Sequence, residues 1–211
     1  MGDKAKLIPE AAEDWLISRI KDSPAKHYAM VPSHPIGWTA GKWREWYPEV
    51  VVPEGFTGVV TNELLADVQG HLTTTAQKYF WQKGWWDQHQ RQLEALVKFW
   101  QGSRMIFSGD IHAQGVVDIR SSGDLVLEKP VKSILVGPVS TSDATWPSAA
   151  RGIAAGELGW VISDEVLATR EVNGFTIFEF EGPEARVRLF DCGGYDRSKG
   201  EGAQRVDEIV I

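Results

Sequence analysis

Cysteine is almost absent from this sequence of 211 residues, in which Cys192 is the single thiol. One thiol cannot close a disulfide within the chain, and a zinc site built from cysteine side chains is excluded as well. Any bound metal ion would therefore have to be held by His, Asp, Glu or Asn side chains.

Long apolar runs and clusters of positive charge are also missing. No stretch of about 18 apolar residues occurs, so the sequence predicts no membrane span. The opening segment MGDKAKLIPEAAEDW has no apolar signal-peptide core, and the cellular compartment stays undetermined. The net charge is −7 without any basic stripe. This pattern argues against a nucleic-acid partner, because binding to a phosphate backbone requires clustered Lys and Arg.

Several common catalytic motifs do not occur either. The sequence has no Gly-x-Ser-x-Gly, no Gly-rich phosphate loop with its lysine and no dinucleotide-binding fingerprint. It also has no internal repeat and no low-complexity segment. Its length suits one domain or part of a larger one.

Tryptophan, by contrast, is frequent, with ten residues. One interpretation is that these side chains anchor the core and its interfaces, which the helical spacing of several of them favours. The other is a non-catalytic binding module, in which the Trp-rich loops at 36–47 and 81–86 hold a sugar or a partner protein.

Apolar periodicity predicts an α/β fold that is mixed up to about residue 112 and mostly β afterwards. Helices are predicted over 9–22, 63–68 and 85–101. Strands are predicted over 27–33, 104–110, 115–120, 125–127, 133–139 and 161–166.

The C-terminal part contains clear turn signals. Asn173-Gly174 predicts a hairpin between REV and FTIFEFE, and Gly182-Pro183 predicts the next turn. After it, Ala185, Val187 and Leu189 alternate with Arg186, Arg188 and Phe190, as in a half-buried strand. The last dozen residues predict either a loose tail, within 196–211, or an edge strand.

Two segments place potential metal ligands directly after predicted buried strands. His34 follows HYAMVPS, and Asp110 and His112 follow RMIFS. A carboxylate oxygen and an imidazole nitrogen are good ligands for Zn, Mn or Fe. An Asp-x-His pair also arises by chance, and His34 taken alone would more often be a structural histidine. The residues by themselves leave both interpretations open.

Four segments resemble, in order, the late motifs of bacterial calcineurin-like metallophosphatases, close to the alkaline phosphatase D-like branch. They are VPSHPIGW, WQKGWWDQHQRQLEAL, MIFSGDIHAQG and LVGPVSTSDATWPSAARG. The final segment GFTIFEFEGPEARVRLFDCGG is similar to the strand pair that closes that domain. The resemblance covers roughly residues 8 to 195, and SGDIHA is its most specific part.

The resemblance implies a four-layer αββα sandwich and hydrolysis of a small phosphate ester by two divalent metal ions. The identity of the ions, whether Mn, Zn, Fe or Ca, stays open. By resemblance, His34 matches the fourth metal-binding block of the family. Asp110 and His112 match the fifth, with Asp110 standing where many relatives have His. Catalytic roles are implied for His34 and His112.

The early blocks of that family are missing before His34. No Asp-x-His or Gly-Asp-x-x-Asp occurs there, so the resemblance implies that residues 1–211 form a single, partial domain. The bridging carboxylate would be absent, which leaves three ligands for two ions. The alternative is an interaction subunit that another polypeptide completes.

The sequence contains further, weaker candidates for site residues. Lys42 and Arg151 could contact a phosphate oxygen, and Trp146 is a pocket-lining residue by resemblance. His89, expected on the exposed flank of its helix, is interpreted as structural or as a support for the metal ligands. The geometry should place the side-chain nitrogens of His34 and His112 within about 8 Å. The missing half should leave the strands of HYAMVPS and RMIFSGD open.

Overall fold

The computed structural model describes residues 6, 8–32, 35–40, 78–79, 83–109, 112–139, 153–155, 161–192 and 203–211. The α/β class is confirmed, since the two described helices precede β4 and every later described element is a strand. The elements are α1 (Glu10–Asp22), β1 (His27–Met30), β2 (Trp38–Ala40), β3 (Lys78–Tyr79), α3 (Lys83–Phe99), β4 (Ser103–Ser108), β5 (Gln114–Ser122), β6 (Leu125–Val136), β7 (Ile153–Ala155), β8 (Val161–Arg170), β9 (Gly174–Glu181), β10 (Glu184–Asp191) and β11 (Gln204–Val210).

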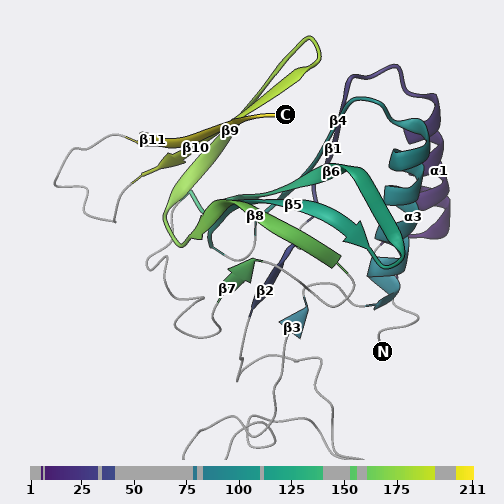
Figure 1. Cartoon of the computed structure of the whole chain (residues 1–211), viewed down its shortest axis with the longest axis horizontal. Helices are drawn as coiled ribbons and strands as arrows, with labels where there is room; N and C mark the ends of the chain where they lie inside the picture. The colour runs from purple at the N-terminus through teal and green to yellow at the C-terminus, as the bar shows by residue number, and fades with distance from the viewer. Residues whose placement is uncertain are drawn as a thin grey trace, which may run out of the picture.

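The fold is built around a mixed five-stranded sheet with the order β1-β4-β6-β5-β8. Helices α1 and α3 pack beside this sheet, and the three-stranded sheet β11-β10-β9 covers its other face (Figure 1). A smaller sheet, β3-β2-β7, lies below these layers in the same view. Within the described residues, no helix has the length and apolar character needed to cross a membrane.

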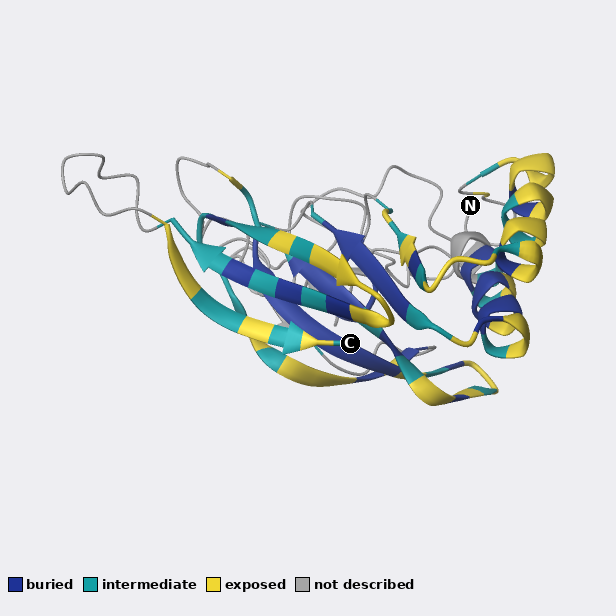
Figure 2. Cartoon of the chain, turned by 90° about the horizontal axis from the view of Figure 1, so that it is seen from above, coloured by how far each residue is buried: buried dark blue, intermediate teal, exposed yellow. Residues whose placement is uncertain are grey.

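Strand β4 shows how the sheet is buried from both sides. Ile106 belongs to the core cluster shared with the helices, whereas Met105 and Phe107 belong to the cluster shared with β10. This alternation follows from the twofold side-chain period of a strand. The central strands are accordingly dark blue along most of their length in Figure 2.

The expectation that RMIFSGD would be left open is therefore wrong for β4. This strand is paired on one side with β1 and on the other with β6, and both of its faces are covered. Its second cover comes from the C-terminal sheet of the same chain. Strand β1, in contrast, lies at the edge and has β4 as its partner among the described strands.

The two strands predicted over 125–127 and 133–139 are one continuous strand, β6. The sequence pattern breaks because Lys129-Pro130 interrupts the apolar residues. Proline lacks a backbone donor, and it is tolerated in a sheet where the ladder is already irregular. The β5–β6 register shifts at this level, from Ile119↔Val131 to Ser121↔Val126, so Pro130 breaks no regular ladder.

Asn173-Gly174 connects two different sheets, so the hairpin predicted there is wrong. Strand β8 pairs with β5, whereas β9 pairs with β10. Gly174 is required by close packing, because a Cβ atom there would lie 2.1 Å from the Phe190 carbonyl oxygen.

The turn predicted at Gly182-Pro183 is confirmed as the β9–β10 hairpin. Gly182 has φ +59°, and the proline ring keeps the next φ negative, which fits a II′ turn. The alternating strand after it is confirmed as well, with Ala185, Val187 and Leu189 buried. Of the two alternatives for the C-terminus, the structure has an edge strand, β11, paired with β10.

A buried carboxylate joins the two helices. Glu13 on α1 is 3% exposed and accepts hydrogen bonds from Arg91 Nε at 2.7 Å and Nη2 at 2.9 Å. Gln88 Nε2 donates to the same carboxylate at 3.0 Å. The hydrogen bond from Arg91 is the main reason that the pKa of Glu13 lies below its usual range. Charge-assisted contacts of this kind stabilise more than neutral ones.

We expect Glu13→Gln to lower the free energy of unfolding by about 1–3 kcal/mol at pH 7, because a charged acceptor is lost. A lowered carboxyl pKa stabilises the fold above the unfolded pKa, and this contribution disappears as the pH falls through the folded pKa. The deficit should therefore shrink below about pH 4.5. Urea unfolding at pH 7 and below about pH 4.5 measures this difference in stability. The exposed neighbour Asp14→Asn is the control. Equal effects of the two variants would contradict the expectation.

Candidate functional site

Strands β1 and β4 are parallel neighbours, with Met30 opposite Ile106. Their carboxyl ends therefore lie at the same edge of the five-stranded sheet. Strand β6 is parallel to β4 and ends at this edge too. The predicted ligands His34 and Asp110 follow β1 and β4 in sequence, but both lie outside the described residues. The distance of about 8 Å expected between the side-chain nitrogens of His34 and His112 therefore stays a prediction.

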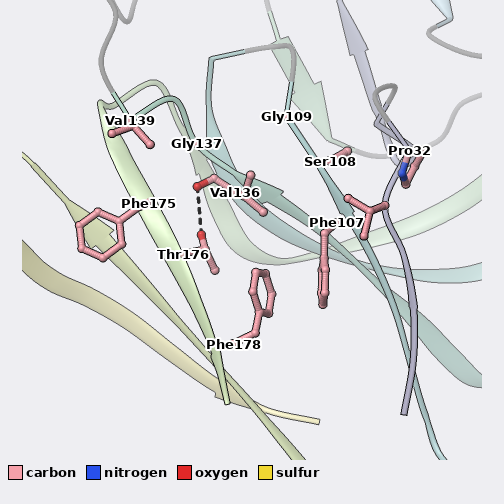
Figure 3. Close-up of a pocket in the computed structure, with 11 residues that line it drawn as sticks. Pro32, Phe107, Ser108, Gly109, Val136, Gly137, Val139, Phe175, Thr176 and Phe178 are labelled. Atoms are coloured by element: carbon pink, nitrogen blue, oxygen red, sulfur yellow. Dashed lines mark hydrogen bonds between the residues drawn. The ribbon is translucent and has the colours of Figure 1, made fainter. Parts of the chain in front are cut away.

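A pocket of about 590 Å³ opens at this edge (Figure 3). It lies where the ends of β1, β4 and β6 meet β9 of the C-terminal sheet. Its lining residues are Val31, Pro32, Phe107, Ser108, Gly109, Val136, Gly137, Val139, Phe175, Thr176 and Phe178. Gly109 immediately precedes Asp110, and Pro32 stands two residues before His34. The pocket is therefore flanked in sequence by both predicted ligand segments.

His112 is the predicted ligand that the structure describes. It is half-buried and has φ +51°, shortly before β5 begins at Gln114. A positive φ is uncommon outside glycine, although histidine adopts it more often than most residues. Such conformations cost roughly 1–3 kcal/mol and persist where the surrounding structure determines them, which is frequent at functional sites.

Ser108 is a residue that sequence reasoning missed. It is 2% exposed, and its Oγ has no hydrogen-bond partner among the residues that the structure describes. Side-chain alternation along β4 places this hydroxyl on the face of Ile106, away from Phe107. A buried polar atom without a partner needs an explanation, and a water molecule or a ligand is one. The sequence signal was its position in SGD.

His89 does not lie on an exposed flank of its helix, as expected, but is 1% exposed. Burial lowers its pKa to about 3, so the imidazole is neutral at pH 7. Neighbouring polar residues on α3, Gln88 and Gln92, are also buried. Helical periodicity placed His89 on an exposed flank, whereas the packing of α3 buries this side chain together with its polar neighbours.

The structure describes only some of the remaining candidate residues. Lys42, Trp146 and Arg151 lie outside the described residues. Trp38 and Trp100 are buried core residues, as the first interpretation of the tryptophans predicts, while Trp15 is 63% exposed. Of the Trp-rich loops, 41–47 and 81–82 lie outside the described residues.

Within the described part of the chain, no three His, Cys, Asp or Glu side chains are grouped as a metal site would require. Two of the three predicted ligands are not in that part. The described residues that line the pocket are apolar residues, glycines, Ser108 and Thr176, and none of them carries a charge. The sequence did not indicate that Phe175, Thr176 and Phe178 line a pocket, because they belong to a separate sheet.

Comparison with known proteins leaves the family open. No family model matches the sequence, and no curated protein matches it. Among solved structures, the chain is similar to one described as "Structure of PhoD", with a TM-score of 0.46 and 12% identity over 99% of this chain and 34% of that chain. The chain thus spans about a third of that protein's length. A likeness at this TM-score establishes no common fold, so membership of the metallophosphatase family is a proposal.

Proposed function

We propose that this chain carries the late ligands of a metal-dependent phosphoesterase site, in which His34, Asp110 and His112 hold one divalent ion. The observation that carries the proposal is the parallel pairing of β1 and β4 beside a single pocket. Because both strands end at one edge, the segments that follow them start close together. The left-handed backbone of His112 supports a functional role for the same region.

The donor set fits a single transition-metal ion. Two imidazole nitrogens and a carboxylate oxygen suit Zn, Mn or Fe, and three protein ligands leave a position for substrate. When bound, such an ion polarises a phosphoryl group and makes water a better nucleophile at neutral pH. The chain's own contribution is to orient these three side chains and to position the ester, with Lys42, Arg151 and Trp146 as further candidate contacts.

A second ion has no evident ligands in this sequence. No Asp-x-His or Gly-Asp-x-x-Asp precedes His34, so no carboxylate is assigned to bridge two ions. We therefore expect the 211-residue chain to bind one divalent ion weakly and to hydrolyse simple aryl phosphates poorly or not at all.

Metal titration and an aryl-phosphate assay, monoester and diester, test this expectation with Mn, Zn, Fe or Ca added. His112→Ala should weaken metal binding at least tenfold, because one of three ligands is lost. His27→Ala is the matched control, since His27 lies at the opposite end of β1 and contacts Ser103 Oγ.

The outcomes separate the family from the completeness of the site. Robust metal-dependent turnover that disappears in His112→Ala would confirm the phosphoesterase function but contradict the expected weak activity. Metal binding and turnover that His112→Ala leaves unchanged would contradict both. Equal losses in His112→Ala and His27→Ala would point to folding rather than to metal ligation.

A further inference from the structure

The pocket at the end of β1, β4 and β6 has an aromatic interior. The rings of Phe107 and Phe178 stack with their centroids 3.8 Å apart and an interplanar angle of 29° (Figure 3). The hydroxyl of Thr176 is already engaged, because its Oγ1 donates to the Val136 carbonyl oxygen at 3.0 Å. The surface offered by these side chains is therefore mainly apolar.

The mouth of the pocket is apolar as well. Val31, just after β1, is 75% exposed, and Val139, just after β6, is 73% exposed. A single exposed valine is ordinary on a protein surface. Two exposed valines at the rim of an apolar pocket enlarge its apolar surface. Contiguous apolar surfaces of this kind are typical of binding sites.

The size of the pocket restricts the ligand. Its volume of about 590 Å³ is in the range of small-molecule sites, roughly 300–1,000 Å³. Among the residues that the structure describes, those lining the pocket carry no charge, so they offer no ionic partner for a phosphate group itself. An aromatic ring, which can pack against the ring pair at about 4.5–7 Å between centroids, matches this lining better than a polar group.

We infer that this pocket binds a neutral aromatic group, and that it is the organic part of the phosphate ester. The second half of this inference rests on the proposed function. The connection is the sequence position of Pro32 and Gly109, which line the pocket and directly lead into the predicted ligand segments. The phosphate would then lie toward those segments, with the aromatic group against Phe107 and Phe178.

Fluorescence titration with 1-naphthol, a neutral aromatic alcohol, tests the pocket without any metal. We expect saturable binding, weakened at least tenfold in the double variant Val31→Lys/Val139→Lys, because two charges would border an apolar cavity. These residues are exposed, so the variant should fold, whereas Phe178→Ala would also disturb the core. Val126→Lys is the matched control, since Val126 is also 73% exposed but stands near the other end of β6.

The inference is overturned if 1-naphthol shows no saturable binding, or if Val126→Lys weakens it as much as the rim variant does. The metal titration of the wild type and of His112→Ala decides the proposed function separately, because little or no turnover is expected of this chain. If a metal gives measurable turnover, a lower KM for 1-naphthyl phosphate than for glycerol phosphate, lost in the rim variant, supports both. If His112→Ala leaves metal binding unchanged while 1-naphthol still binds at the rim-sensitive site, the proposed function fails and the aromatic pocket stands.

Discussion

Replacing Gln114 with glutamate should lower the free energy of unfolding by about 3–5 kcal/mol at pH 7, the usual cost of an unpaired buried charge. Gln114 is fully buried on β5, and its Nε2 donates to the carbonyl oxygens of Phe175 at 3.1 Å and Phe190 at 3.2 Å. A third carbonyl, that of Val136, lies at 3.5 Å. One amide group thus joins the five-stranded sheet to the C-terminal sheet.

A carboxylate at position 114 would meet hydrogen-bond acceptors where the Nε2 group now donates. An oxygen in place of Nε2 would face carbonyl oxygens and could donate only after taking up a proton. Two glycines also enclose the side chain, since a Cβ atom at Gly137 would lie 2.7 Å from Gln114 Cγ and one at Gly174 would lie 2.8 Å from Nε2. The side chain therefore cannot move aside without displacing backbone.

Urea unfolding of both proteins at pH 7 measures this effect. Gln101→Glu makes the same chemical change at an exposed position after α3, where a change within about 0.5 kcal/mol is expected. Similar values for the two variants would show that Gln114 does not join the sheets. Because Val136 and Phe175 also line the pocket, Gln114→Glu should weaken 1-naphthol binding, while Gln101→Glu should not.

Acid should destabilise this protein through His89. Its pKa falls from 6.5 to about 3 on folding, because the buried imidazole cannot be hydrated when charged. Between these values the unfolded chain binds a proton that the folded chain does not, so stability decreases as the pH falls from about 6.5. At about 1.4 kcal/mol per pKa unit, the loss from this group is roughly 2 kcal/mol at pH 5.

The variant His89→Gln removes this titration while keeping a polar side chain of similar reach. Urea unfolding at pH 7.5, 6 and 5 should give a flatter pH dependence for the variant than for the wild type, whatever their difference at pH 7.5. Parallel curves for the two proteins would mean that His89 becomes protonated in the folded state. The Glu13 contribution is separable, since it changes only at lower pH.

Local patterns in the sequence predicted most of the described helices and strands. Helices α1 and α3 and strands β1, β4 and β10 lie where periodicity placed them, within a few residues. The turn at Gly182-Pro183 was also predicted. These features depend on side-chain spacing and on turn chemistry, which are properties of consecutive residues. The same applies to the position of the predicted ligands directly after β1 and β4.

Other features were decided only by the tertiary structure. The pairing of β8 with β5, the transfer of β9 to a second sheet and the cover that this sheet provides for β4 all depend on backbone groups far apart in sequence. The burial of Gln114 and His89 has the same origin, because neighbouring elements enclose both polar side chains. For His89, helical spacing had predicted an exposed position. The aromatic pocket arises likewise, since Phe107 and Phe178 meet only when the two sheets pack face to face. Sequence spacing records which residues share a face of one element, but not which element will cover that face.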